Sequence, residues 1–224
     1  MNDEAPLAYV KDYYEQRLER RRLFQEATTF YLKELRHVRG RRVLNAGCGP
    51  QLYDYLRYFG ELPEVYFGVD INRSTFEYMK RSRNTDLLAS RRFARDECID
   101  VRDVCADISD CMESLGPLDC VVGVGFFGTF CEQRFRRVID ATHRGLRPLG
   151  LLVNISWYGC HLSKRVHRRK LRYRYDGLNT PSLDDTVRWT ERQGFRLVHR
   201  KLFNVPDKTA YGWETIQSCV FRKS

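Results

Sequence analysis

The sequence predicts an α/β fold in which a mostly parallel sheet is covered by helices on both faces. Short apolar runs alternate with helical stretches, and these runs are almost continuously apolar, as in strands that are buried on both sides. At 224 residues, with 42% hydrophobic and 30% charged residues, the chain can form a sizeable core and lacks a disordered or fibrous composition. We expect one main domain, 41–224, preceded by a helical cap or lid, 1–40.

Apolar periodicity and turn residues place the individual elements. Strands are expected at 42–46, 65–70, 99–106, 118–124, 149–155, 195–203 and 216–221. Helices are expected at 9–22, 23–35, 52–59, 74–83, 132–146 and 182–193, with Gly40 as a stop signal and Ser74 as an N-cap.

Charge and cysteine content indicate which partners and which compartment to expect for the chain. The net charge is +10, which favours anionic partners. The longest weakly charged stretch, 118–131, is too short for a transmembrane helix, and the acidic start does not resemble a secretory signal. The eight cysteines are scattered without a Cys-x-x-Cys pair, so neither a zinc knuckle nor a redox motif is spelled out. We expect reduced core thiols, no metal centre and a cytoplasmic location.

Polar or glycine residues follow three successive predicted strands. Gly47 and Gly49 come after the first strand, Asp70 ends the second, and Asp107 follows the third. Ligands of parallel sheets bind at the carboxyl ends of the strands, where glycine allows close backbone approach and an acid can accept bonds from ribose hydroxyls. Each feature also has a plainer interpretation: an ordinary turn, a helix N-cap and a solvated loop.

Five segments in order resemble the class I S-adenosylmethionine-dependent methyltransferases. They are Val43-Leu44-Asn45-Ala46-Gly47-Cys48-Gly49-Pro50, Val69-Asp70, Ala106-Asp107-Ile108, Leu118-Asp119-Cys120-Val121-Val122 and Gly145-Leu146-Arg147-Pro148-Leu149-Gly150. The last resembles the helix-to-strand turn of the family, which is usually Leu-Lys-Pro-Gly-Gly. The resemblance implies a Rossmann-like sheet of seven strands with the last strand antiparallel, and S-adenosyl-L-methionine as cofactor.

The resemblance also assigns cofactor-binding positions. It implies contacts from Gly47 and Gly49 to the methionine part, from Asp70 to the ribose, and from Asp107 to the adenine amino group. The further cofactor positions are Asn45, Cys48, Ile71, Ile108, which would cover a ring face, and Gly125, which would line the gap between sulfonium and substrate. Asn45 stands where the family usually has Asp or Glu, and Gln51 replaces the usual third glycine. Because an amide lacks the charge that faces the ammonium, binding is expected to be weaker, and an inactive relative stays an alternative.

The acceptor is expected to be a small metabolite methylated on oxygen or nitrogen. The Asp/Asn-Pro-Pro-Tyr/Phe motif of nucleic-acid amine methyltransferases is absent, and Cys131 has no preceding proline of the cytosine-C5 pattern. An apolar, aromatic stretch after the fourth strand suits a partly hydrophobic substrate. The predicted substrate-binding residues are Tyr9, Tyr13, Phe126, Phe127, Trp157 and Tyr158. The predicted catalytic residues are Tyr14 and His161, with His167 as a weaker candidate for a base.

The basic run 161–174 leaves a second interpretation open. It is rich in Lys and Arg, lacks acidic residues and includes Tyr173. Such a run is a solvated face, a handle for an anionic substrate or an RNA contact. The alternatives to a small-molecule methyltransferase are therefore an RNA-modifying methyltransferase and a cofactor-binding relative without catalysis.

Overall fold

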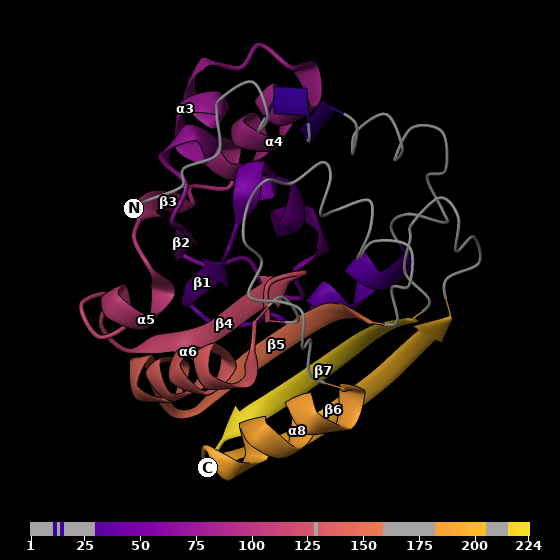
Figure 1. The fold of residues 1–224 in the computed structure, drawn as a ribbon. Helices are drawn as coiled ribbons and strands as arrows, with labels where there is room; N and C mark the ends of the chain where they lie inside the picture. The colour runs from indigo at the N-terminus through magenta and orange to yellow at the C-terminus, as the bar shows by residue number, and fades with distance from the viewer. Residues whose placement is uncertain (1–10, 13, 16–29, 128–129, 159–181, 205–214) are drawn as a thin grey trace.

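The computed structural model describes residues 11–12, 14–15, 30–127, 130–158, 182–204 and 215–224 (Figure 1). Its centre is a sheet of seven strands in the order β3-β2-β1-β4-β5-β7-β6. The strands are β1 (Arg42–Ala46), β2 (Val65–Asp70), β3 (Asp100–Cys105), β4 (Leu118–Val124), β5 (Leu146–Tyr158), β6 (Phe195–Asn204) and β7 (Thr215–Lys223). The predicted fold class is confirmed.

The pairing pattern brings six strand ends to one edge of the sheet. β1 pairs in parallel with both β2 and β4, which in turn pair in parallel with β3 and β5. β7 alone runs antiparallel, between β5 and β6. Since the strand order turns back at β1 and β4, the carboxyl ends of these two strands flank the switch point of the sheet.

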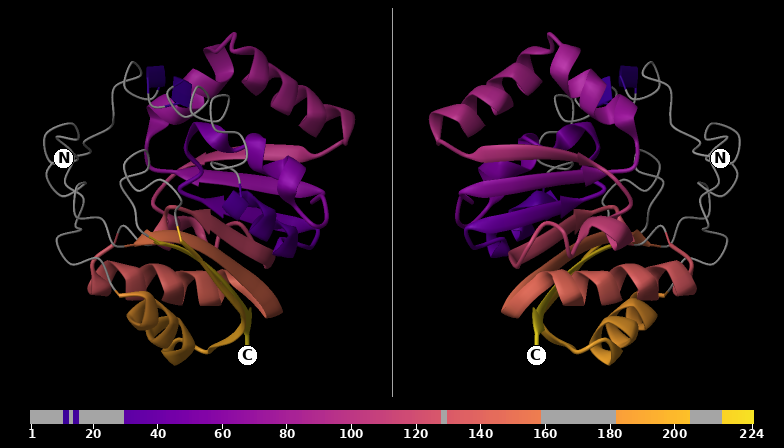
Figure 2. Two further views of the ribbon diagram at one scale, coloured as in Figure 1. Left: turned by 90° about the vertical axis from the view of Figure 1, so that its right-hand side faces the viewer. Right: turned by 90° about the vertical axis from the view of Figure 1, so that its left-hand side faces the viewer.

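Helices cover the sheet (Figures 1 and 2), and each face has its own core of buried side chains. One face packs against η1 (Phe30–His37), η3 (Asp54–Tyr58), α3 (Arg73–Arg81) and α4 (Thr85–Asp96). The other packs against α5 (Ile108–Cys111), α6 (Glu132–Gly145) and α8 (Leu183–Arg192). Burial on both faces explains why the central strands read as continuous apolar runs.

The structure corrects two details of the predicted helices. The N-cap of α3 is Asn72, whose side chain accepts a bond from Ser74 N, so the prediction of Ser74 as the cap was wrong by two residues. The predicted helix 52–59 contains short 3-10 helix instead, η3, which η2 (Gly49–Gln51) precedes. Its aromatic residues lower the helix propensity, and Tyr55 is buried in the core on this face of the sheet.

Helix α4 was missing from the prediction. Asn84 caps it by accepting bonds from Asp86 N and Leu87 N. Its buried positions are Leu87, Ser90 and Ala94, of which only the first is a large apolar residue. The face that contacts the core is therefore too weakly hydrophobic to give a helical period in the sequence.

Only part of the predicted N-terminal cap lies within the described residues. Phe30–His37 is 3-10 helix, which packs on β5 and β7 and bears buried Leu32 and Leu35. Tyr14 is buried beside Tyr78, with ring centroids 5.4 Å apart. The division into a cap and a main domain stays a prediction.

The described cysteines are free thiols that differ in exposure. Cys48, Cys111, Cys120 and Cys219 are buried free thiols, as predicted, whereas Cys98 and Cys105 are free and exposed, and Cys131 is half-buried. Within the described ranges, no helix has the length and apolar character that crossing a bilayer requires.

A strained leucine stands at the start of β5. Residues 147–150 form a bulge in β5. Leu118 of β4 pairs with Leu146, but Cys120 pairs with Leu151, so these four residues lie opposite a single residue of β4. Leu149 has φ +63° and its side chain is 67% exposed. The family that the sequence resembles usually has glycine here, and a left-handed conformation costs an L-residue about 1–2 kcal/mol.

Leu149→Gly is therefore expected to stabilise the chain by about 0.5–1 kcal/mol, which is the relief of strain less the greater freedom of glycine in the unfolded state. Urea unfolding measures this difference. Leu149→Ala is the matched control, because it removes the same exposed side chain but keeps the strain. Equal effects of the two variants would show that φ is not the cause.

Candidate functional site

A backbone hydrogen bond joins the turn after β1 to the carboxyl end of β2. Gly47 and Gly49 have φ +59° and +52°, the region in which glycine is the unstrained residue. Cys48 lies between these two glycines in the chain, and its backbone N–H donates to Val69 O at 3.1 Å. Nothing lies within 4 Å of the position of an added Cβ on Gly49, whereas one on Gly47 would come 2.2 Å from the Phe126 ring. The turn thus has an open side at Gly49 and an aromatic cover at Gly47.

The Asp70 carboxylate is held at this turn by two backbone donors. Its Oδ2 accepts from Gly49 N at 3.0 Å, and its Oδ1 accepts from Asn72 N at 2.8 Å. Burial raises the pKa of Asp70, and these two bonds oppose the rise. A carboxylate has about four lone-pair positions, so each oxygen keeps capacity for a further donor. This is an acceptor fixed in place for a polar ligand.

Asn45 presents a buried acceptor below the turn. The residue is 1% exposed, and its Nδ2 donates to Tyr66 Oη at 3.0 Å. Its Oδ1 is buried and has no hydrogen-bond partner in the described part of the chain. Because an unpartnered buried oxygen costs about 1–3 kcal/mol, a ligand that donates a hydrogen bond to it would be stabilised.

The tip of β3 adjoins that of β2, since Ala106 N donates to Asp70 O at 3.1 Å. Asp107 then caps α5, with its Oδ1 accepting from Ser109 N and Oγ. Its Oδ2 pairs with Arg134 of α6 at 3.3 Å. Although burial raises the pKa of Asp107, the bonds from Ser109 and the charge of Arg134 lower it more, so it lies below its usual value. Asp107 therefore stays ionised near neutral pH.

A row of contacts joins Asp107 to the glycine turn. The Arg134 guanidinium lies 5.0 Å from the centroid of the Phe130 ring, and Phe130 packs edge-on against Phe126 at 4.7 Å. Phe126 in turn covers Gly47. The row puts a cation and two aromatic rings along the carboxyl edge of the sheet.

Other predicted positions differ in exposure. Ile71 is 59% exposed beside Asp70, as a residue that packs on a planar ligand would be, whereas Ile108 is buried. Cys48 is buried, and burial raises its pKa well above the usual thiol value, so it is a neutral thiol. Gly125 has φ +71° and its N–H donates to Ile155 O at 2.7 Å.

Two predicted side chains lie inside the packed protein. Phe127 is fully buried, and its ring fills the space beside Gly123. Tyr14 is also fully buried and donates its hydroxyl to Asp54 Oδ2 at 3.1 Å. Both placements favour packing over contact with a substrate, so neither has a role in the function proposed below.

The remaining predicted positions are described in backbone or not at all. Trp157 and Tyr158 end β5, where they pair with Ile216 and Thr215 at the carboxyl edge. Tyr9, Tyr13, His161, His167 and the basic run 161–174 lie outside the described residues.

Arg134 and Phe130 were absent from the predicted site. A signal for them existed: α6 is the helix that follows β4 in the chain, so its first residues lie near the edge where β4 ends. Asn72 was also missed, although Asn is among the preferred N-cap residues and stands directly before the helix.

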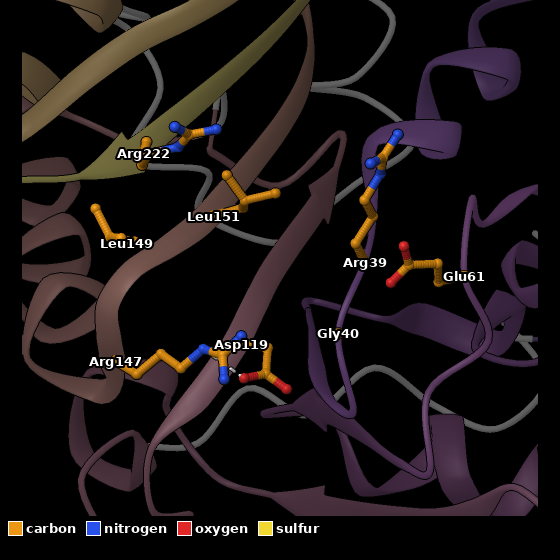
Figure 3. A pocket seen from close by; sticks show the side chains of 8 residues that line it. All are labelled: Arg39, Gly40, Glu61, Asp119, Arg147, Leu149, Leu151 and Arg222. Carbon is orange, nitrogen blue, oxygen red and sulfur yellow. Dashed lines mark ion pairs between the residues drawn. The ribbon is translucent and has the colours of Figure 1, made fainter.

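Surface hollows lie at the other edge of the sheet. One of them, of about 300 Å³, is lined by Arg39, Glu61 and Arg222 and by Arg147, which pairs with Asp119 at 2.7 Å. Figure 3 shows these side chains. A second hollow beside it shares Arg147 and Asp119. Asp119 lies at the amino end of β4, so both hollows are away from the carboxyl ends of the strands, where the candidate site lies.

No protein-family model and no curated protein sequence matches the chain. Solved structures with the same fold do. A TehB-like SAM-dependent methyltransferase from Corynebacterium glutamicum is 21% identical, with TM-score 0.59 over 97% of this chain and 99% of that one. Magnesium protoporphyrin IX methyltransferase from Synechocystis with bound SAH is 11% identical, with TM-score 0.63 over 97% and 99%. The N-methyltransferase NodS from Bradyrhizobium japonicum, in complex with S-adenosyl-L-homocysteine, is 13% identical, with TM-score 0.58 over 89% and 86%.

At these identities the likeness shows the fold. The chain has the Rossmann-like fold of class I S-adenosylmethionine-dependent methyltransferases, with the strand order that the resemblance implies.

Proposed function

We propose that the chain is an S-adenosylmethionine-dependent methyltransferase acting on an oxygen or nitrogen atom of a small metabolite. The observation that carries the proposal is the arrangement at the tips of β1 and β2, where the Asp70 carboxylate is held beside an open glycine turn. This combination is what a ribose with two hydroxyl donors requires.

The residues at the carboxyl edge fit the cofactor part by part. Asp70 would accept from the ribose hydroxyls, and exposed Ile71 would pack beside the adenine. The unpartnered Oδ1 of Asn45 would accept a hydrogen bond from the ammonium of the methionine part, directly or through water. The remaining cofactor positions are Cys48, Ile108 and Gly125. They would contact the cofactor through backbone atoms and would shape the surface against which it lies.

Two of the cofactor contacts that the resemblance implies would require protein side chains to alter their present contacts. Asp107 would have to share its carboxylate between Arg134 and the adenine amino group. Phe126 covers Gly47, so a methionine chain that reaches Gly47 would contact or displace this ring. Phe126 is accordingly the described side chain that we propose to lie between the cofactor and the substrate.

S-adenosylmethionine supplies an electrophilic methyl group on a sulfonium sulfur. The protein then contributes by aligning the acceptor atom in line with that bond and by excluding water. Phe126 and Phe130 would form an apolar wall for this purpose. His161 stays our proposed base for an acceptor that must lose a proton, and Tyr9, Tyr13, Trp157 and Tyr158 our proposed substrate contacts.

A transfer experiment tests the proposal. The full chain is incubated with methyl-tritiated S-adenosylmethionine and either a small-molecule cell extract or total RNA. We expect label in the small-molecule fraction, and none with the Asp70→Ala variant. Label in RNA would instead support the alternative that uses the basic run 161–174. Cofactor binding in calorimetry without transfer to either pool would indicate the non-catalytic alternative.

A further inference from the structure

A buried carboxylate and two histidines meet away from the strand tips. Glu34 and His37 lie on η1, and His199 lies on the edge strand β6. We call these three residues the Glu34 cluster. Glu34 is 1% exposed, and the potential ligand atoms of the three side chains all lie within 4.8 Å of one another.

The two histidines point at the same oxygen of Glu34. His199 Nε2 lies 2.9 Å from Glu34 Oε2, and His37 Nε2 lies 3.6 Å from it. The two rings are 4.5 Å apart and tilted by 36°. At 3.6 Å no hydrogen bond forms, and the buried His37 Nε2 has no hydrogen-bond partner among the described residues.

Lys201 occupies the other oxygen of the carboxylate. Its Nζ lies 3.3 Å from Glu34 Oε1, so the ammonium fixes the carboxylate without competing for Oε2. A charged group that orients a carboxylate in this way is common behind metal ligands. The shared oxygen and the two imidazole nitrogens remain as one convergent set.

We propose that Glu34, His37 and His199 form a binding site for a divalent transition-metal ion, with zinc as the best match. Two imidazoles and one carboxylate are a donor set that zinc prefers. Ligand atoms about 2.0–2.1 Å from a tetrahedral ion lie about 3.3 Å apart. The two measured separations from Oε2, 2.9 and 3.6 Å, lie on either side of that value.

Binding requires one proton to change place. His199 Nε2, which now faces the carboxylate, would ligate through its lone pair, with the imidazole proton carried on Nδ1. The ion would tie η1 to β6 and leave a fourth position for water. The His37 and His199 side chains are 25% and 31% exposed, so the cluster lies close to the protein surface.

Zinc titration of the full chain, free of any histidine tag, tests the proposal. Calorimetry is expected to show one tight equivalent, which His37→Ala and His199→Ala each weaken at least 30-fold. His143→Ala is the matched control, because His143 packs against Phe195 outside the cluster. Cobalt(II) should give a visible spectrum without thiolate charge-transfer absorption, which excludes the cysteines as ligands.

Each outcome decides for or against the site. Failure of the wild-type chain to bind zinc, or unchanged binding by both histidine variants, overturns it. Glu34→Gln should also lose binding, and if that buried variant does not fold, the more exposed His37 still provides the test. The proposal does not depend on methyl transfer, so the two experiments fail or succeed separately.

Discussion

Asp70→Ala is expected to lower the affinity of the chain for S-adenosylmethionine at least about 100-fold, because two hydrogen bonds to a charged acceptor contribute about 1.5–3 kcal/mol each. Calorimetry with the cofactor and with its demethylated product measures the loss. Asp70→Asn should have an intermediate effect, since it keeps one acceptor oxygen. Unchanged affinity in the alanine variant would contradict the proposed ribose site.

Stability has to be measured alongside binding, because Asp70 also serves the protein itself. Its removal leaves Gly49 N–H and Asn72 N–H without their acceptor, at a cost of about 1–3 kcal/mol. Asp100→Ala is the matched control: this exposed acid at the amino end of β3 pairs only with Arg102 among the described residues. It should leave cofactor affinity unchanged.

The two glycines of the turn are expected to respond differently to alanine. Both have positive φ, so both substitutions cost about 1–2 kcal/mol of backbone strain. At Gly47 the new methyl also meets the Phe126 ring, which adds about 1–3 kcal/mol of overpacking. At Gly49 the methyl projects into open space. Urea unfolding should therefore show the larger loss for Gly47→Ala.

Binding should follow a different order from stability. A methyl group on Gly49 would occupy the space beside Asp70 that we assign to the cofactor, so Gly49→Ala should weaken cofactor binding at least 10-fold while the fold is retained. The double variant Gly47→Ala with Phe126→Ala tests the clash itself, because removal of the ring should recover part of the stability lost. Equal unfolding losses for the two single glycine variants would contradict the role of Phe126.

The fold could be predicted because its information is local. The β1, β2 and β4 boundaries coincide with the ends of apolar runs, since strands buried on both faces tolerate few polar residues. The convergence of Gly49 and Asp70 then follows from parallel pairing, without knowledge of any side-chain contact. Helix α4 was not predicted because Ser90 and Ala94, which lie with Leu87 on its buried face, are too small or too polar to give an apolar pattern.

The finer features of the site depend on tertiary contacts that no local pattern carries. The pairing of Asp107 with Arg134 depends on how α6 crosses the sheet, and the cover on Gly47 depends on the conformation of Phe126. The Glu34 cluster joins η1 to β6, elements far apart in sequence, and so could not be predicted from spacing.

Two exposed thiols among the described residues lie near opposite ends of β3. Cys105 pairs with Asp70 in register, and its Sγ lies 3.8 Å from Ile71 O, whereas Cys98 precedes β3 at the far end. A maleimide reagent would consequently read out occupancy of the nucleoside position by mass spectrometry. Alkylation of Cys105 would slow when the position is filled, and the rate at Cys98 would serve as the internal reference.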